Sequence, residues 1–75
     1  MAAEPLGAPS PPETPGARIK ARRRTLGLTQ VDLAQAVAVS RQTVISMETG
    51  DYAPSVYLAL KVAAVLQVSV EDVWG

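Results

Sequence analysis

Apolar side chains recur at helical spacing from Ile19 to Trp74, in short segments separated by glycine, serine and threonine residues. Intervals of three and four residues place one apolar stripe on each segment, whereas a half-buried strand would alternate apolar and polar residues. No segment of the chain alternates in this way. The pattern therefore predicts an all-α fold built from five short helices.

Each predicted helix is delimited by residues that favour helix ends. Gly27 and Gly50 suit the position after a helix, and a serine or threonine side chain can accept a hydrogen bond from the first turn. Thr29 followed by Asp32 also has the spacing of a capping box. These signals predict helices over residues 18–26, 30–37, 41–49 and 56–66, and a short last helix that Ser69 caps.

The apolar stripes indicate which side chains form the core. Leu33, Ala34 and Val37 share one face of the second predicted helix. The fourth predicted helix, residues 56–66, has almost no polar surface, and a helix that is apolar on most sides is buried. We expect it to be the central helix of the domain.

The first part of the chain has a different composition. Residues 1–16 contain five of the six prolines and two of the five glycines. Proline blocks regular structure, and such a segment buries too little apolar surface to offset the entropy lost on ordering. The sequence predicts a disordered Pro-rich tail over residues 1–16 and one helical domain over residues 17–75. A protein partner that binds the tail is a further possibility.

The charges are distributed unevenly, although the formal net charge is zero. Glu4 and Glu13 lie in the tail, whereas all seven basic residues lie from Arg18 onward. Residues 18–75 contain seven basic and five acidic residues and so carry a net charge of +2. Five of the bases are concentrated in residues 18–24. A local basic cluster suits nucleic acid even when the net charge does not suggest it.

Several function classes are excluded by residues that the chain lacks. It contains no cysteine and no histidine, which excludes disulfides, Cys/His zinc sites and thiol or imidazole catalysis. We recognise no glycine-rich phosphate loop and no nucleophile–base pair, so we expect neither an enzyme nor a cofactor. No segment resembles a membrane span or a secretory signal, which predicts a soluble cytoplasmic protein without membrane partners.

The third predicted helix has two different sides. Val44, Met47 and Glu48 fall on one side at helical spacing. The other side combines side chains that can read base edges: arginine binds guanine, glutamine binds adenine, serine binds several bases, and isoleucine contacts the thymine methyl group. The alternative is an ordinary solvated face, on which an exposed isoleucine is unusual. The candidate base-reading residues are Arg41, Gln42, Ile45 and Ser46.

One set of residues in the stretch Ile19–Trp74 forms a recognisable pattern, namely Arg23, 26–30, Leu33, Ala34, 39–44, 48–50, Pro54, Ser55 and 66–69. With these residues the stretch resembles the Cro/C1-type (Xre) helix-turn-helix family of phage and bacterial regulators. The resemblance implies a five-helix lambda-repressor-like DNA-binding domain. It also implies a sequence-specific transcriptional regulator of double-stranded DNA and, since most members are repressors, a repressor.

The resemblance also implies roles for individual residues. Gln30 matches a phosphate-binding position at the start of the second helix, where Thr29 and backbone N–H groups also face the DNA backbone. Thr43 matches a position that contacts the DNA backbone or packs. Arg23 and Glu48 match a partly buried ion pair that connects the first helix to the third, although Arg23 could instead be one more solvated base.

The sequence departs from the family pattern at three places. Ala38 replaces the usual glycine, so this turn is either strained by a left-handed alanine or has a negative φ. Arg22 stands where leucine is common, and we expect it to point toward DNA phosphates. The loop 51–53 lacks the basic residues of some relatives, which leaves Tyr52 either as a phosphate hydrogen-bond donor or as a side chain packed on the fourth helix.

One such domain reads about four to six base pairs, so specific binding generally requires two copies on a repeated half-site. Val70, Val73 and Trp74 form the expected homodimer interface, with Tyr57 as a further candidate. The alternative is that Trp74 folds back on the fourth helix. A second class of function also stays open, namely an antitoxin or bridging factor whose main partner is a protein. The Pro-rich tail is the only feature that favours it.

Overall fold

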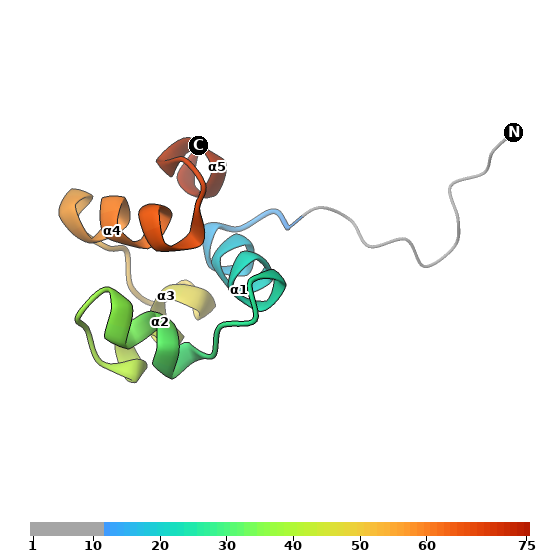
Figure 1. Cartoon of the computed structure of the whole chain (residues 1–75). Coiled ribbons are helices and arrows are strands. Elements are labelled where there is room, and N and C mark those ends of the chain that lie inside the picture. The colour runs from blue at the N-terminus through green and yellow to red at the C-terminus, as the bar shows by residue number, and fades with distance from the viewer. Residues whose placement is uncertain (1–11) are drawn as a thin grey trace, which may run out of the picture.

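The computed structural model describes residues 12–75 of the chain. Figure 1 shows α1 and α4 between the α2–α3 pair at one end and α5 at the other. Residues 1–11 of the predicted tail, which spans residues 1–16, lie outside the described residues, and so does a partner that binds them. Those residues contain five helices and no strand: α1 (Pro15–Thr25), α2 (Gln30–Ala36), α3 (Arg41–Thr49), α4 (Val56–Leu66) and α5 (Val70–Trp74).

A hydroxyl side chain caps the N-terminus of every helix. The side chains of Thr14, Thr29, Ser40, Ser55 and Ser69 each accept a hydrogen bond from the backbone N–H three residues later. These hydrogen bonds satisfy donors that the first turn of a helix leaves unpaired. The predicted bounds of the third and fourth helices are confirmed.

The predicted start of the first helix, Arg18, was wrong. The helix begins at Pro15, because Thr14 caps it and proline is well suited to the first helical position. Pro15 and Gly16 had been assigned to the tail on composition. Gly16 is buried in α1, and an added Cβ would collide with the backbone oxygen of Glu48. The absence of a side chain at Gly16 therefore allows α1 to approach α3 closely.

Two of the caps are complete capping boxes. Asp32 accepts from the Thr29 backbone N–H at 2.8 Å, and Asp72 accepts from the Ser69 backbone N–H at 2.9 Å. Hydrogen bonds from the backbone N–H and from the capping hydroxyl group lower the pKa of both carboxyl groups. Both acids thus remain ionised at the positive ends of their helix dipoles.

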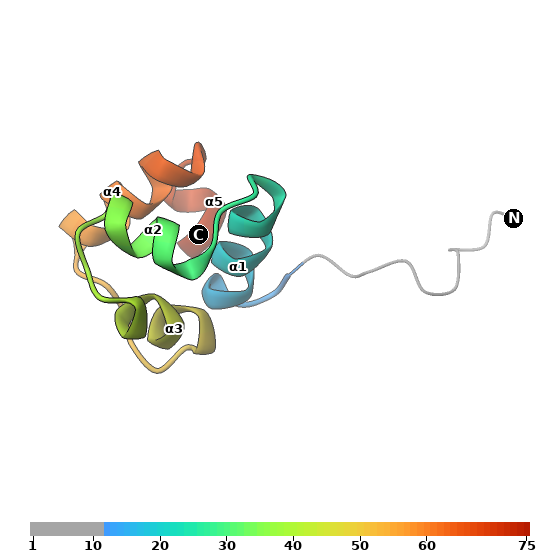
Figure 2. The same cartoon turned by 60° about the horizontal axis from the view of Figure 1, so that its bottom comes forward.

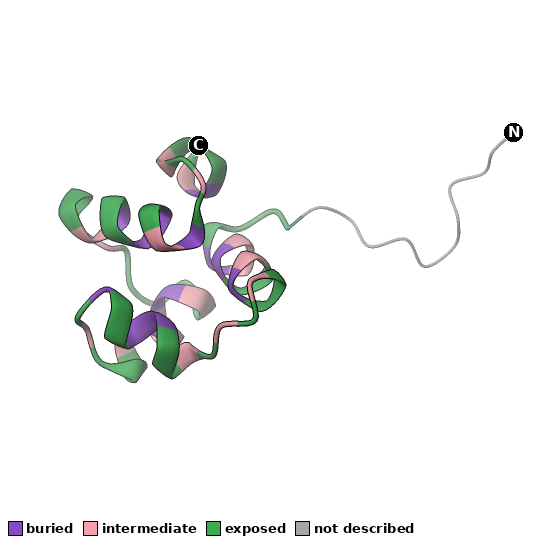
Figure 3. Cartoon of the chain, in the orientation of Figure 1, coloured by how far each residue is buried: buried purple, intermediate pink, exposed green. Residues whose placement is uncertain are grey.

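The core lies where one face of each helix turns inward, as Figure 3 shows. Leu33, Ala34 and Val37 are buried, as the apolar stripe of the second helix predicted. The largest fully buried side chains are Ile19, Leu33, Val37, Val44, Val62 and Leu66. None of the helices in residues 12–75 combines the length and apolar character that a membrane-spanning segment requires.

The expectation that the fourth helix is the central buried helix was wrong in part. One face of α4 enters the core through Ala59, Val62, Ala63 and Leu66. The opposite face leaves Val56, Tyr57 and Leu60 exposed by 74%, 82% and 53%. Because both faces of α4 are apolar, the spacing of its apolar residues did not distinguish the buried face from the exposed one.

Ala38 resolves the question that the sequence left open at the turn after α2. Its φ is +60°, so this alanine adopts the left-handed conformation. The neighbouring Val39 N–H donates to the Ala34 oxygen at 2.9 Å, which closes the end of α2. A left-handed conformation is unfavourable for a residue with a Cβ atom.

Ala38→Gly should therefore raise the free energy of unfolding by about 0.5–1 kcal/mol, since relief of the strain exceeds the added entropy of the unfolded chain. Urea unfolding followed by circular dichroism measures the change. Ala36→Gly is the matched control in the last turn of α2, and it should lower stability by up to about 1 kcal/mol. Equal losses in both variants would contradict the strain at Ala38.

Candidate nucleic-acid interface

Helix α3 is fixed to the domain along one side and free along the other. Val44 and Met47 are buried and hold α3 against the core. Arg41 and Gln42 are exposed at its N-terminal end. Figure 2 shows α3 at the edge of the molecule beside α2, to which it is joined by a short link. Two helices in this arrangement, with the second one presented outward, form a helix-turn-helix.

The predicted base-reading residues share the outer side of α3. Ile45 and Ser46 are half-buried and follow the exposed Arg41 and Gln42. Within residues 12–75, no hydrogen bond or ion pair involves the Arg41, Gln42 or Ser46 side chain. Their donors and acceptors thus remain available to a ligand.

The predicted ion pair between Arg23 and Glu48 is present and almost completely buried. The Nε of Arg23 lies 2.7 Å from Oε2 of Glu48, and the two side chains are 9% and 4% exposed. Arg23 also donates from Nη2 to Glu48 at 3.3 Å and from Nη1 to the Leu28 oxygen at 2.9 Å. This bidentate geometry connects α1 to the end of α3 and to the segment before α2.

Gln30 completes the surroundings of this ion pair. Its Nε2 donates to Oε1 of Glu48 at 3.1 Å, so one of its amide N–H groups is used inside the domain. For Gln30 we predicted only a contact with a DNA phosphate, and the contact with Glu48 was not predicted. The second N–H of the amide stays available.

Thr29, which caps α2, and Thr43, in the first turn of α3, form local hydrogen bonds. The hydroxyl of Thr29 accepts from the Asp32 N–H at 3.0 Å, and Thr29 is exposed. The hydroxyl groups of Thr43 and Ser40 lie 3.0 Å apart and form a hydrogen bond at the start of α3. Both threonines thus lie at helix N-termini, where backbone N–H groups favour anions.

The prediction that Arg22 points toward phosphates was wrong. Its Nε donates to the Leu66 oxygen at 2.8 Å, at the end of α4. The last carbonyl groups of a helix lack partners within the helix, and a basic side chain can satisfy them. Arg18 acts similarly, since its Nη1 donates to the Val73 oxygen at 2.9 Å near the end of α5.

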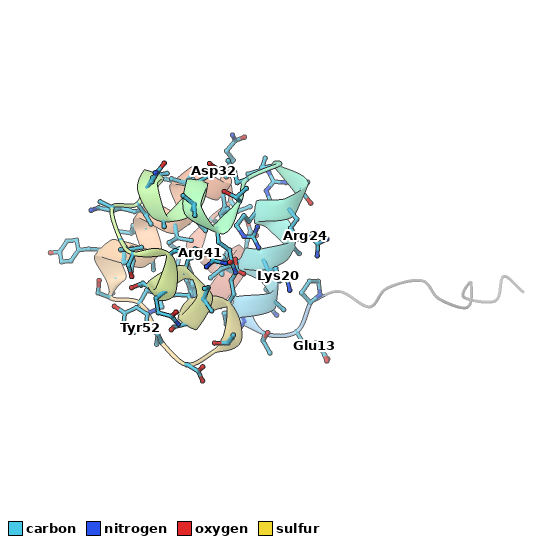
Figure 4. The ribbon with its side chains drawn as sticks, turned by 90° about the horizontal axis from the view of Figure 1, so that it is seen from below. Glu13, Lys20, Arg24, Asp32, Arg41 and Tyr52 are labelled. Atoms are coloured by element: carbon cyan, nitrogen blue, oxygen red, sulfur yellow. The ribbon has the colours of Figure 1, made fainter. Side chains whose placement is uncertain are left out.

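Tyr52 lies on the loop after α3 and is 44% exposed. It lines a surface hollow together with Pro15, Met47, Pro54 and Trp74. Its backbone N–H donates to the Ser46 oxygen at 3.2 Å, which fixes the loop to α3. Among the residues labelled in Figure 4, Tyr52 and Arg41 come from this half of the molecule, whereas Lys20 and Arg24 come from α1.

One of the residues predicted for the dimer interface on the last helix, Val73, is not available for that role. Val73 is 2% exposed and belongs to the core, because α5 packs against α1 and α4. It has no surface to offer a second subunit. Val70 is half-buried, and Trp74 is half-buried and packs against the core.

Comparison with known proteins agrees with this geometry. The Helix-turn-helix family model matches residues 19–73. An HTH-type transcriptional regulator of Methanocaldococcus jannaschii is 46% identical over 57 residues, which cover 76% of this chain and 86% of the relative. The regulator YgzD of Bacillus subtilis is 42% identical over 57 residues, with coverages of 76% and 86%.

Solved structures show the same fold. The P22 c2 repressor in complex with a synthetic operator superposes with a TM-score of 0.81 at 28% identity and covers 84% of this chain and 96% of the repressor chain. The biofilm regulator SinR in complex with DNA gives a TM-score of 0.72 at 36% identity, with coverages of 77% and 94%.

The fold and the outer side of α3 define a lambda-repressor-like DNA-binding domain. The chain belongs to the Cro/C1-type (Xre) helix-turn-helix family, and the protein is a DNA-binding transcriptional regulator. Residues 19–73, which match the family model, include the ion pair and all of α3.

Glu48→Gln should lower the free energy of unfolding by about 3 kcal/mol, because it leaves the buried guanidinium of Arg23 without a countercharge. Urea unfolding at neutral pH measures this loss. Asp51→Asn removes a carboxylate from an exposed position nearby and should change stability by less than about 0.5 kcal/mol. A Glu48→Gln variant as stable as Asp51→Asn would show that the ion pair does not hold α3 in place.

Proposed function

We propose that the protein represses transcription as a homodimer that inserts α3, residues 41–49, into the major groove of specific DNA sites. The observation that carries the proposal is the outer side of α3. Its polar side chains have no partner within residues 12–75, although the helix itself is fixed by Val44, Met47 and Glu48. A rigid helix with free donors is suited to reading bases.

Each residue on this side has a defined chemistry toward base edges. Arg41 can donate two hydrogen bonds to guanine, and Gln42 can both donate to and accept from adenine. Ile45 supplies apolar contact for a thymine methyl group, and Ser46 can bond several bases. The first two residues are the more exposed, so they determine most of the specificity.

The DNA backbone is held on both sides of α3. The start of α2 offers backbone N–H groups, the Thr29 hydroxyl and the second amide N–H of Gln30 to one phosphate. Glu48 holds the Gln30 amide in place for this contact. Thr43 and the exposed Tyr52 hydroxyl contact the phosphates near the two ends of α3.

The repressor role is supported by relatives rather than by an isolated feature of the chain. The P22 c2 repressor was solved in complex with a synthetic operator, and SinR, a master regulator for biofilm formation, was solved in complex with DNA. A domain that occupies an operator excludes other proteins from it, which is sufficient for repression.

Gln42→Ala should lose discrimination at one base position while the domain stays folded. The preferred site is first selected from random-sequence duplexes, and binding is then followed by fluorescence anisotropy at two salt concentrations. Loss of a bidentate contact to adenine should reduce the preference for the selected base by about 1–3 kcal/mol, or roughly 5-fold to 150-fold. Gln35→Ala, an exposed glutamine on α2, is the matched control and should retain the preference.

Two results would count against the proposal. If the wild-type protein binds no duplex even at low salt, the helix-turn-helix serves another role. If Gln42→Ala keeps full selectivity, α3 is not the reading helix in the register that we propose.

The homodimer interface that we propose includes the outer face of α4. Val56, Tyr57 and Leu60 form an apolar strip there, and Tyr57 and Leu60 are three residues apart on one side of the helix. Apolar residues that gather on one exposed face are typical of an interaction surface. Val70 and Trp74 retain part of their surface and remain candidates beside it.

Leu60→Glu should convert the dimer into a monomer, because two carboxylates would be buried across a two-fold axis. Sedimentation equilibrium at tens of micromolar protein measures the mass. Val31→Glu, at an exposed valine on α2, is the control and should remain dimeric. A monomeric wild-type protein at this concentration, in the presence of its DNA site as well as in its absence, would contradict the homodimer.

A further inference from the structure

Two basic side chains of α1, Lys20 and Arg24, have no side-chain partner within the described residues. Both are exposed, and neither forms a hydrogen bond or an ion pair among residues 12–75. The other bases of the same helix all have partners there. Arg18 donates to carbonyl oxygens near the end of α5, Arg22 to the last carbonyl of α4, and Arg23 to Glu48.

Lys20 and Arg24 lie on the side of α1 next to α3. Gly16 and Arg23 mark the face of α1 that touches α3, since they contact the backbone and the carboxylate of Glu48. At 3.6 residues per turn, Lys20 lies about 40° from the direction of Gly16 and Arg24 about 80°. The buried Ile19 lies about 60° to the other side. The two bases are therefore turned away from the core, beside the reading helix.

Figure 4 shows the molecule from below, with Lys20 and Arg24 along α1 and Arg41 on α3 in the same view. The end of α1 continues through residues 26–29 into the start of α2, which carries Thr29 and Gln30. Arg24 is thus the nearer of the two bases to the proposed phosphate contact of α2, and Lys20 lies one helical turn further away.

The domain itself gives little compensation for these two charges. Like charges one helical turn apart repel each other. No acidic side chain among residues 12–75 forms an ion pair with Lys20 or Arg24, and Glu48 accepts from Arg23 and Gln30 instead. Arg24 gains from the helix dipole in the last turn of α1, but Lys20 lies in the middle of the helix and does not.

We propose that Lys20 and Arg24 form a binding site for the phosphodiester backbone of the DNA that flanks the half-site read by α3. The inference rests on the proposed function and adds a contact that lies outside the helix-turn-helix. The lysine ammonium group and the arginine guanidinium group both bind phosphate oxygens, and neither discriminates between bases. The site therefore adds affinity and salt dependence without adding sequence preference.

The experiment compares two duplexes that contain the selected site. One ends at the outer edges of the half-sites, and the other extends by about one helical turn, roughly 10 base pairs, at each end. The slope of log K against log salt concentration is measured for the wild-type protein, for the double variant Lys20→Gln/Arg24→Gln, and for the charge-conserving swap Lys20→Arg/Arg24→Lys.

On the long duplex, the double variant should lose about 0.9 in slope for each phosphate contact removed. The charge-conserving swap should keep the slope of the wild-type protein. On the short duplex, all three proteins should have the same slope, because the flanking phosphates are missing. The preference for the selected site over a variant site should be unchanged throughout, since phosphate contacts carry no base information.

A double variant with the wild-type slope on the long duplex would overturn the inference and leave an ordinary solvated helix face. An equal loss on both duplexes would also overturn it, because the two bases would then act within the half-site or through net charge alone. If Gln42→Ala loses selectivity while the double variant keeps its slope, only this inference fails. If the wild-type protein binds neither duplex, the proposed function fails with it.

Discussion

The ion pair between Arg23 and Glu48 is the constraint on which the arrangement of the helices depends. A buried carboxylate is unfavourable unless its charge is balanced and its oxygens accept hydrogen bonds. Glu48 receives both, from the guanidinium of Arg23 and from the amide of Gln30. One side chain at the end of α3 thereby fixes that helix to α1 and to the start of α2. The close approach of Gly16 to the same turn reinforces the contact.

The basic residues of α1 fall into two groups, those with partners inside the domain and those without. This division explains how a chain of zero net charge can bind DNA. Arg18, Arg22 and Arg23 point inward and bind carbonyl or carboxylate oxygens at the ends of other helices. These contacts hold five short helices together where the apolar core is small. Lys20 and Arg24 are the two bases of α1 whose side chains form no hydrogen bond or ion pair among residues 12–75, so both can bind a ligand directly. Charge counting on the sequence cannot separate the two groups, because the difference lies in their tertiary partners.

The sequence predicted local features well and long-range partners poorly. Cap residues act on the next three positions, so Ser40 and Ser55 were sufficient to predict where α3 and α4 begin, and Gly50 indicated the end of α3. Thr14 is also a capping residue, but the prolines around it indicated a tail, so the start of α1 was not predicted from the sequence. The partner of Arg22 lies 44 residues away, and no local pattern records it. The candidate base-reading residues were predicted from helical spacing, whereas their lack of hydrogen-bond partners among residues 12–75 is visible only in the structure.

The division of α3 into a fixed side and a free side separates stability from specificity. Val44, Met47 and Glu48 carry the packing and the buried charge, so changes there alter the position of the whole helix. Arg41 and Gln42 make no side-chain contact that the fold requires. A substitution at either position should therefore cost little stability. Under the function that we propose, it would also change the preferred DNA sequence, so that the same core could support regulators of many different sites.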